Sequence, residues 1–367
     1  MSRSDPRDSG YGPILRRMVV PALFVGALFA VYLWRSPGEG PSREVVVFSG
    51  PALGTSYVVK VVADGGVPPE QSESLALEIE EALAAVDASM STWREDSELE
   101  RFNRHGTEPF PLSPALDEVM ATALEIGIRS GGAFDITVGP LVDAWGFGPG
   151  EESRAPSPER IAGLLAQTGS HLLTLDRHSR TLQKSGDRIR CDLSAIAKGY
   201  AADKVAAALA SAGFTDFMVE LGGEVVANGV NAAGEDWRIG IEVPDPEQRA
   251  VYAVVALDGA ALATSGNYRN FRVEDGRVVS HIIDPRTGRP VTHALASVSV
   301  IAETCMEADA WATALSVLGP EEGLEVARRE GLAVLFIARQ PDGDLEETST
   351  PAFESFRALD STGENTS

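Results

Sequence analysis

The stretch that decides the fold is FMVELGGEVVA, residues 217–227. It holds two short apolar runs, 217–221 and 225–227, on either side of a Gly-Gly pair, which is typical of two strands joined by a tight turn. Further strand-like runs follow at 237–243, 252–257 and 261–264. Strands joined by short turns pair antiparallel, because the turn reverses the direction of the chain.

Outward from this stretch, helices alternate with further strands. Leu75, Ile79, Leu83 and Val86 recur every three to four positions and predict a helix over residues 68–86. The mixture of antiparallel runs and helices indicates an α+β fold rather than a doubly wound parallel sheet. The remaining predicted helices are 114–130, 157–167, 195–212, 307–318 and 321–330, and the remaining predicted strands are 45–48, 55–63, 172–176, 181–184, 295–301 and 333–338.

The composition is that of a folded protein of one large or two ordinary domains. The chain has 367 residues, of which 44% are hydrophobic and 23% charged, and its net charge is −23. This charge would repel a phosphate backbone, so we expect no nucleic-acid partner. Two cysteines, Cys191 and Cys305, are too few for a disulfide scaffold or a multi-cysteine metal site. They either pair in an oxidising compartment or are buried in the core.

The N-terminal segment differs from the acidic body. Residues 18–34, MVVPALFVGALFAVYLW, carry no charge, and Arg16 and Arg17 precede them. A run of this length lies at the lower edge of membrane spans, and its basic flank predicts a cytoplasmic N-terminus. No small-x-small cleavage site follows, which favours an uncleaved anchor over a cleaved secretory signal or a buried helix. We expect a cytoplasmic tail at 1–17, an anchor or signal at 18–34 and a tether at 35–44.

The densest group of polar residues is CDLSAIAKGYAAD, residues 191–203. Asp192 is placed at a strand end, Ser194 as the cap of a helix that begins near Ala195, and Lys198 on the first turn of that helix. A helix N-terminus with free N–H groups attracts anions, and a phosphate there would also meet the lysine. The alternative interpretation is an ordinary capped helix with a surface lysine.

A second group lies in the helix predicted at 307–318. Asp309 and Thr313 are four residues apart and therefore share one face of it. A carboxylate and a hydroxyl are hard oxygen ligands, suited to Mg²⁺ rather than Zn²⁺. The alternative, a solvated helix face, is weakened because the surrounding residues are apolar nearly all round.

His281, in SHIIDPRTGRP at residues 280–290, is a candidate general base. A structural histidine is the alternative. Two glycine-rich turns, at 222–223 and near Gly266, either let the backbone approach a ligand closely or simply reverse the chain. Gly131 and Gly132 are predicted to end a helix, with Asp135 after them at the start of a strand.

These motifs, taken in order, resemble the ApbE family of flavin transferases, which act on FAD and protein. The resemblance covers about residues 45–340. The matching motifs are LGT (53–55), MSTW (90–93) with DS (96–97) and FN (102–103), GAFD (132–135) with VGP (138–140), DLS (192–194) with AKGYA (197–201), LGG (221–223), TSGNY (264–268), SHIIDPRTG (280–288) and ADAWATA (308–314).

The resemblance implies an ApbE-type, T-fold-like α+β domain over residues 45–340 that binds FAD and Mg²⁺. A C-terminal extension, 341–367, would follow, with a disordered end. By motif position, the metal ligands would be Asp309, Thr313 and the main-chain carbonyl of Ala195, and His281 would be the base. The residues that would contact FAD are Leu53, Trp93, Ala133, Phe134, Asp135, Asp192, Lys198 and Ile283.

The chain departs from the family pattern in three places. Leu53 replaces a frequent Met, Ala312 stands where some members carry Asp, and the chain has no cysteine for lipid attachment after its apolar run. The first is a mild change at an apolar contact. The second removes one metal contact that the family uses elsewhere.

The function implied is Mg²⁺-dependent transfer of the FMN moiety of FAD to a Thr or Ser hydroxyl of a partner protein, with release of AMP. The implied acceptor is a flavin-carrying subunit of a membrane redox complex. We expect the protein at the bacterial inner membrane, spanning it once, with its catalytic domain on the periplasmic side. The alternatives are hydrolysis of FAD to FMN and AMP, and a non-catalytic periplasmic flavin-binding protein.

Overall fold

The computed structural model describes residues 43–147, 155–245, 247, 250–266, 271–274 and 277–358. From Glu44 on, these residues belong to one compact unit. The predicted tail and the predicted membrane anchor, 1–17 and 18–34, lie outside the described residues. Among the helices that the structure does describe, none has both the length and the hydropathy needed to cross a bilayer.

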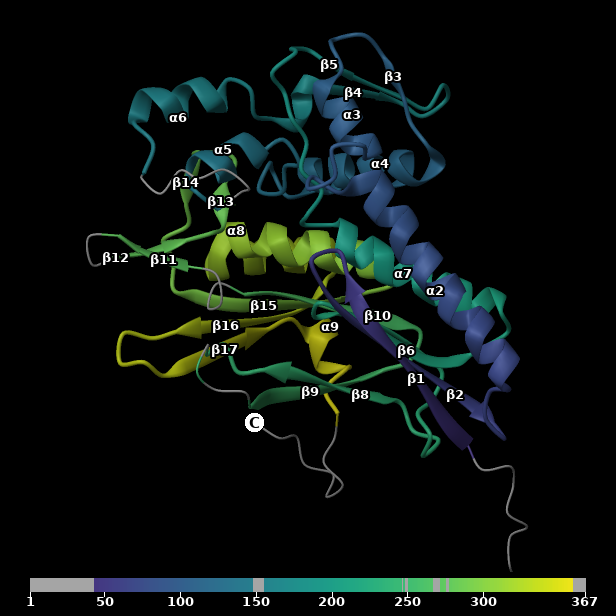
Figure 1. Ribbon diagram of the computed structural model, residues 1–367. Helices are drawn as coiled ribbons and strands as arrows, with labels where there is room; N and C mark the ends of the chain where they lie inside the picture. Colours follow the sequence, from purple (N-terminus) through teal and green to yellow (C-terminus); the bar gives the residue numbers. More distant parts are fainter. Residues whose placement is uncertain are drawn as a thin grey trace, which may run out of the picture. The chain divides into compact units, whose positions relative to one another are not determined.

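An eight-stranded sheet forms the centre of the unit (Figure 1). Each neighbouring pair from the second strand to the eighth is antiparallel, as the sequence predicts. In their order across the sheet, the strands are β1 (Arg43–Ala52), β2 (Thr55–Asp64), β6 (Asp216–Leu221), β7 (Glu224–Asn228), β10 (Ala260–Gly266), β15 (Leu295–Ala302), β16 (Ala333–Arg339) and β17 (Leu345–Ser349).

Both faces of this sheet are buried. In β16, Val334 and Phe336 belong to one hydrophobic core, while Leu335 and Ile337 belong to another. Successive side chains of a strand point to opposite faces, so an apolar run without alternation is what a doubly covered strand requires. The sheet is therefore the middle of three layers.

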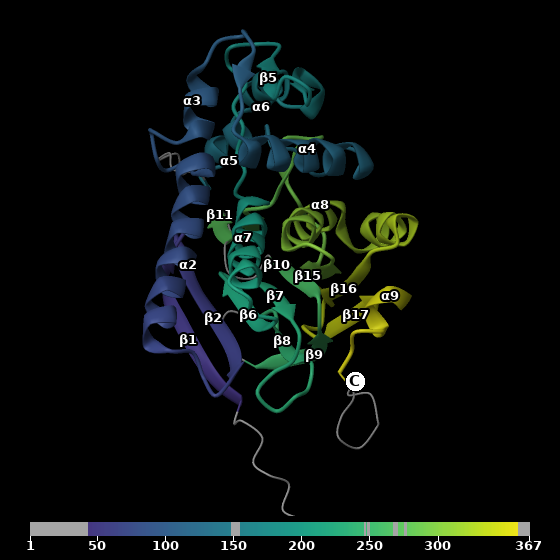
Figure 2. The same cartoon turned by 90° about the vertical axis from the view of Figure 1, so that its right-hand side faces the viewer.

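Three long helices cover one face, and a hairpin with a short helix covers the other (Figures 1 and 2). The helices are α2 (Pro69–Met90), α7 (Ala197–Ser211) and α8 (Cys305–Glu330), and α7 packs between the other two. The opposite face is covered by β8 (Trp237–Glu242), β9 (Val251–Leu257) and α9 (Pro351–Glu354). The site described below lies on the side of the three helices.

Smaller elements lie beyond the helical layer or beside one end of it in Figure 1. They include a three-stranded sheet, whose β4–β5 hairpin confirms the prediction for residues 172–184. These elements are α3 (Glu98–Arg104), β3 (Phe110–Pro111), α4 (Pro114–Arg129), α5 (Gly139–Ala144), α6 (Pro158–Leu165), the 3-10 turn η1 (Ser170–Leu172), β4 (Leu173–Asp176), β5 (Thr181–Lys184), β11 (Phe271–Glu274), β12 (Arg277–Ser280), β13 (Ile283–Asp284) and β14 (Arg289–Pro290).

Helix α8 contains a kink between its two predicted halves. Gly319 has φ +80° and ψ −176°, which no helix residue adopts, and Pro320 follows it. The kink therefore separates the helices predicted at 307–318 and 321–330.

The segment before α7 differs from its prediction. Helix α7 begins at Ala197, and Ser194 does not cap it. Instead, a side-chain oxygen of Asp192 accepts the N–H of Ser194 at 2.8 Å. This hydrogen bond forms a turn, and the helix begins only after it. Asp192 lies in this irregular segment rather than at a strand end, and Asp135 likewise lies in a turn. Short polar side chains compete with the helix for the backbone here, which explains the error.

The folded body continues past the predicted boundary at residue 340. Strand β17 pairs with β16, and Phe353 of α9 is fully buried in the second core. The N–H of Ala358 also donates to the carbonyl of Val254 in β9. The sequence does not reveal this strand, because β17 is an edge strand whose side chains after Leu345 are polar and half-buried or exposed, so it lacks an apolar period.

Cys191 and Cys305 are free thiols, and both are buried. The interpretation of the two cysteines as core residues is therefore confirmed, and their pairing is not.

Candidate functional site

The centre of the site is the crossing of α7 and α8. A Cβ atom at Gly199 would lie 2.2 Å from the carbonyl oxygen of Cys305, so only glycine permits this approach of the two helices. The close approach places Lys198, on the first turn of α7, beside Asp309 on α8. The predicted anion-binding turn and the predicted metal-binding face thus meet at one place.

Lys198 lies between two buried carboxylates. Its ammonium forms a hydrogen-bonded ion pair with Oε1 of Glu224, the first residue of β7, and lies 3.8 Å from Oδ1 of Asp309. The side chains of Glu224 and Asp309 are 4% and 7% exposed, against 30% for Lys198. We call these three residues the α7–α8 charge cluster; with all three groups ionised, it carries a net charge of −1.

The cluster shifts the proton affinities of its members. Burial raises the pKa of Glu224, repulsion from Asp309 raises it further, and the attraction of Lys198 opposes both. Burial alone would lower the pKa of Lys198, but Asp309 and Glu224 outweigh it and raise that pKa above its ordinary range. Lys198 therefore stays charged and compensates only one of the two carboxylates.

Two oxygen atoms near the cluster lack their usual partners. Among the described residues, Oε2 of Glu224 is buried and accepts no hydrogen bond. The N–H of Gly199, which in a regular helix would donate to the carbonyl of Ala195, donates instead to Oδ2 of Asp309 at 3.1 Å. A buried excess of negative charge with an unpartnered carboxylate oxygen is an environment that favours a cation.

These residues fit the predicted ligand set for Mg²⁺. Asp309 is buried and Thr313 half-buried one turn further along α8, and the released carbonyl of Ala195 lies at the start of α7. In the part of the chain that the structure describes, no group of three or more His, Cys, Asp and Glu side chains is arranged around a metal position. The predicted set is not of that kind, because it contains one carboxylate, one hydroxyl and one carbonyl and leaves the rest of the shell to water and phosphate.

The turn that carries Leu53 lies next to the Gly-Gly turn that precedes Glu224. A Cβ atom at Gly222, whose φ is +65°, would lie 2.7 Å from the side chain of Thr55. Leu53 itself has φ +46°, in the left-handed region that non-glycine residues rarely adopt. Strained backbone of this kind is typical of functional turns. The structure thereby connects Leu53 to the α7–α8 charge cluster.

The carboxylate of Asp135 is fully engaged within the protein. Its Oδ1 accepts the N–H and hydroxyl of Thr137, at 2.8 and 2.6 Å, and its Oδ2 accepts the N–H of Ser170 at 2.7 Å. The side chains of Ala133 and Phe134 are buried in the main core. This segment is joined to the polar group at residues 191–203 by the N–H of Asp192, which donates to the carbonyl of Ile136.

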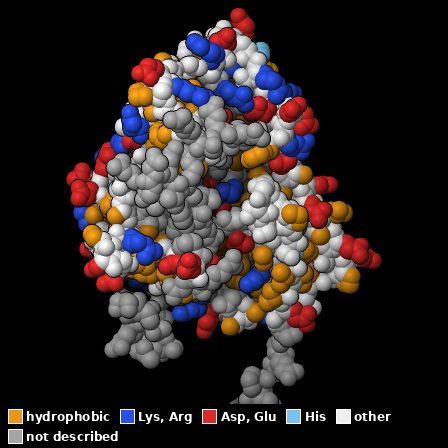
Figure 3. Space-filling view, turned by 60° about the vertical axis from the view of Figure 1, so that its left-hand side comes forward, with side chains coloured by type: hydrophobic (Ala, Val, Ile, Leu, Met, Phe, Trp, Pro, Cys, Tyr) orange, Lys and Arg blue, Asp and Glu red, His pale blue; other side chains and the backbone are white. Residues whose placement is uncertain are grey.

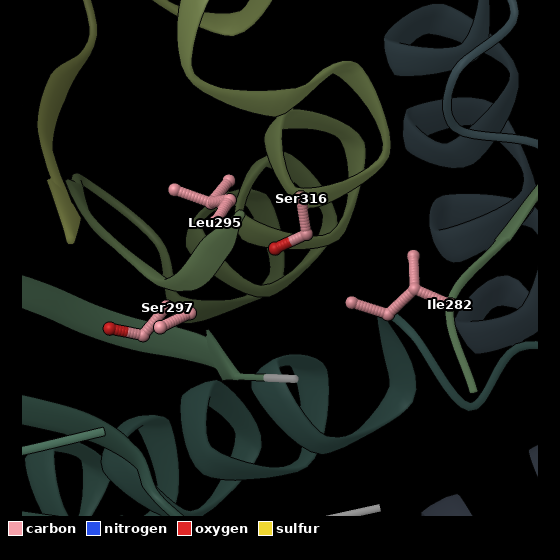
Figure 4. A pocket seen from close by; sticks show the side chains of 5 residues that line it. Ile282, Leu295, Ser297 and Ser316 are labelled. Atoms are coloured by element: carbon pink, nitrogen blue, oxygen red, sulfur yellow. The ribbon is translucent and has the colours of Figure 1, made fainter. Parts of the chain in front are cut away.

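His281 follows β12, and its half-buried ring packs edge-to-face on Phe147 with the ring centroids 6.3 Å apart. Ile283 is buried in a small cluster with Leu141, Trp145 and Ile161. Ile282, between them, lines a narrow recess together with Ser316, which lies three residues after Thr313 on α8 (Figure 4). The His281 segment therefore lies beside the helix that carries the predicted metal ligands.

The recess is completed by three residues of β15, Leu295, Ala296 and Ser297, and it is too narrow for a water molecule. A wider hollow opens in the face shown in Figure 3, where basic and acidic side chains lie beside hydrophobic ones.

Trp93 lies on the loop between α2 and α3, and 78% of it is exposed. Arg94 pairs with Asp87 and Asp96 at 3.2 and 3.1 Å, and the hydroxyl of Ser97 donates to the carbonyl of Ser91 at 2.7 Å. These contacts hold the loop while leaving the indole open to a ligand.

Sequence reasoning missed Glu224. It belongs to the stretch quoted first, directly after the Gly-Gly pair and at the start of an otherwise apolar strand. An acidic residue in a doubly covered strand needs a buried cation or donor, and that was the signal available.

Comparisons with known proteins establish the family. The family model "ApbE family" matches residues 53–336. The FAD:protein FMN transferase of Escherichia coli (strain K12) is 42% identical over 341 residues, which are 91% of this chain and 96% of that protein. The FAD:protein FMN transferase of Vibrio cholerae serotype O1 is 43% identical over 322 residues, covering 87% and 94% of the two chains.

Solved structures agree with the sequence comparisons. The flavin transferase ApbE from Vibrio cholerae superposes with a TM-score of 0.78 at 41% identity, covering 86% of this chain and 99% of that one. The apo form of the flavinyl transferase ApbE from Pseudomonas stutzeri gives 0.78 at 40% identity, covering 86% and 97%. The chain belongs to the ApbE family, and the predicted resemblance and α+β fold are confirmed.

Proposed function

We propose that the chain transfers the FMN moiety of FAD to a Thr or Ser hydroxyl of a partner protein in a Mg²⁺-dependent reaction. The observation that carries the proposal is the α7–α8 charge cluster, a buried site of net negative charge beside a helix N-terminus. Two relatives named FAD:protein FMN transferase are 42% and 43% identical to this chain over 91% and 87% of its length, which supports the same activity.

In the reaction, the acceptor hydroxyl oxygen forms a bond to the phosphorus nearest the riboflavin. The bond between this phosphorus and the bridging oxygen breaks, and AMP leaves with the electron pair. Asp309, Thr313 and the carbonyl of Ala195 would hold Mg²⁺, which when bound supplies positive charge to the pyrophosphate. His281 accepts the hydroxyl proton.

The remaining predicted residues would bind FAD. Trp93 offers an exposed aromatic plane, and Leu53 offers an apolar contact on a strained turn. Ile283 is buried beside His281, and Lys198 would meet a phosphate at the start of α7. Because the side chains of Ala133, Phe134 and Asp135 are buried or engaged, we propose that their main chain forms the contact. Asp192, half-buried in the adjoining turn, would offer its second oxygen.

The proposed location rests on the N-terminal segment, and the proposed acceptor is the one that the family resemblance implies. We propose that residues 18–34 anchor the protein in the bacterial inner membrane and that the catalytic domain lies on the periplasmic side. Flavin-carrying subunits of membrane redox complexes would meet it there. An uncleaved anchor should leave Arg16 and Arg17 in the mature protein and keep it in the membrane pellet after a high-salt wash; a soluble form that begins after Trp34 would reject this.

The activity is tested by intact mass. Purified protein is incubated with FAD, Mg²⁺ and a candidate flavin-carrying subunit, and the acceptor is expected to gain the mass of one FMN while AMP appears in equal amount. FMN and AMP in solution with an unmodified acceptor would indicate the hydrolase instead. No turnover, with FAD bound, would indicate a binding protein.

The role of His281 is tested with His281→Ala, with His178→Ala on the exposed β4–β5 turn as the matched control. Loss of a general base costs roughly 10²–10⁴-fold in rate. We expect transfer to fall by this factor while FAD binding, measured by flavin fluorescence, is retained. Loss of FAD binding together with thermal stability would make His281 a structural residue.

A further inference from the structure

Glu224 has no part in the predicted ligand set, yet it is the most deeply buried member of the α7–α8 charge cluster, with 4% of its side chain exposed. It enters the site from β7, across from both helices. The Gly222–Gly223 turn before it positions the strand so that its first side chain reaches Lys198.

The two carboxylates of the cluster have different hydrogen-bond partners. The ammonium of Lys198 is hydrogen-bonded to Glu224, whereas its 3.8 Å separation from Oδ1 of Asp309 is beyond hydrogen-bond distance. Asp309 is held by the N–H of Gly199, a neutral donor. Lys198 is therefore drawn toward Glu224, and Asp309 keeps an oxygen that no ammonium occupies directly.

Without the charge of Glu224, this arrangement would reverse. Asp309 would be the remaining counter-charge within reach of Lys198, and a buried ammonium pairs with whatever carboxylate it can reach. A divalent cation would then have to displace the ammonium from Asp309 before binding.

We propose that Glu224 is a positioning residue that holds the Lys198 ammonium off Asp309 and thereby keeps Asp309 available to the divalent cation. The inference rests on the proposed function, because it assigns the cation to Asp309. It adds a residue that acts on the site through Lys198 and touches neither FAD nor the reacting atoms.

The test measures cation binding by FAD-free protein, using Mn²⁺ as the probe and electron paramagnetic resonance to count free ion. Changes in residues that orient metal ligands commonly cost 10–100-fold in affinity. We expect Glu224→Gln to weaken Mn²⁺ binding by about tenfold or more. The matched control is Glu220→Gln, in the same β6–β7 hairpin, where the carboxylate accepts the N–H of Gly223 at 2.8 Å. This control should bind Mn²⁺ as the wild type does.

A double-mutant cycle with Lys198→Met shows whether Glu224 acts through the lysine. In the Lys198→Met background no ammonium competes for Asp309, so Glu224→Gln should change Mn²⁺ affinity by less than about threefold, a long-range charge effect only. The same tenfold loss in both backgrounds would overturn the proposal and make Glu224 a direct ligand. An unchanged affinity in Glu224→Gln would overturn it as well.

Glu224→Asp keeps the test decisive if Lys198→Met does not fold. This variant retains the charge but withdraws the carboxylate by one methylene, so a positioning role requires an intermediate affinity. Wild-type affinity would mean that the charge acts without positioning Lys198, against the proposal. Failure of the proposed function is seen separately, as wild-type protein that binds Mn²⁺ but leaves every acceptor without flavin.

Discussion

Two clusters in this protein have the same charges and opposite surroundings. Arg94 lies between Asp87 and Asp96 at the Trp93 loop, and Lys198 lies between Glu224 and Asp309 where α7, α8 and β7 meet. The carboxylates of the first pair are 32% and 77% exposed, and those of the second are 4% and 7% exposed. Each has one cation and two carboxylates, so the comparison separates the effect of burial from that of charge.

Exposure to solvent determines what each cluster can contribute to stability and binding. On the loop, solvent screens the uncompensated charge, and Arg94 serves to hold the backbone around Trp93. Between α7, α8 and β7, the two carboxylates are largely shielded from solvent, and among the described residues Oε2 of Glu224 has no hydrogen-bond partner. A buried cluster with that deficit is suited to binding a cation, which the exposed one has no need of.

The largest expected effect is that of Lys198→Met on stability. The substitution leaves two buried carboxylates without a cation, and breaking a buried pair costs about 3–5 kcal/mol. Because 30% of the Lys198 side chain is exposed, we expect about 3 kcal/mol, measured by denaturant unfolding at pH 7 without divalent ions. Mg²⁺ should then raise the unfolding midpoint more in this variant than in the wild type, since no ammonium competes with it.

If Lys198→Met were as stable as the wild type, the conclusion that burial distinguishes the two clusters would be wrong. It would mean that solvent reaches the α7–α8 charge cluster as freely as it reaches the loop.

The second effect is catalytic. Asp309→Ala removes the one full negative charge of the predicted ligand set, and we expect the Mg²⁺-dependent transfer rate to fall at least ~100-fold, or about 2.7 kcal/mol in the barrier. Thr313→Ala should cost less, because water replaces a neutral hydroxyl. The measurement is the rate of acceptor flavinylation against Mg²⁺ concentration. Wild-type Mg²⁺ dependence in both variants would place the cation elsewhere.

The difference between the clusters also separates what the sequence predicts from what it does not. The long helices and the core strands were predictable, since their apolar residues recur with local periods of two or 3.6, as in Leu75 to Val86. Lys198 and Asp309 were each recognised from motifs. Their meeting was not predictable, because it depends on the approach of α7 to α8 at Gly199, more than a hundred residues apart in the chain.

Whether a polar side chain is buried also depends on tertiary packing, which the local sequence does not show. Glu224 and Asp96 are both acidic residues near turns, and the local sequence distinguishes them only by the apolar run that follows Glu224. Only tertiary packing leaves one in the core and the other in water. The start of α7 was misplaced for a local reason, since the side chain of Asp192 satisfies the backbone before the helix begins.

The third effect concerns a half-buried carboxylate with neutral partners. Asp203 of α7 accepts the N–H groups of Cys305 and Met306 at 2.8 and 2.9 Å, and so caps the start of α8. Loss of a helix cap costs about 1–2 kcal/mol, and we expect this for Asp203→Ala at pH 7. Denaturant unfolding of both proteins across pH provides the measurement.

The pH dependence of that difference has a definite sign. Burial raises the pKa of Asp203 to about 6, although the N–H bonds oppose it. The folded protein therefore binds this proton more tightly than the unfolded chain, so the contribution of Asp203 to stability increases as pH falls from about 6 toward 4. The gap between wild type and Asp203→Ala should widen over that range. A gap that narrows would show that the N–H groups, rather than burial, dominate the carboxylate.

The smallest effect is expected at the exposed cluster, from Arg94→Met, the counterpart of Lys198→Met. Arg94 donates to both carboxylates of its cluster, which raises its own pKa, and the pKa of Asp96 is lowered by the same bonds. The distances of 3.2 and 3.1 Å show that the pairs form, but the groups are open to solvent, where ion pairs contribute little to folding. We expect the thermal midpoint to change by less than ~2 °C at low salt and to coincide with the wild type in 1 M salt. If Arg94→Met instead destabilised the protein as much as Lys198→Met and kept that loss at high salt, burial would not be what distinguishes the two clusters, and the case for a cation at Asp309 would lose its physical basis.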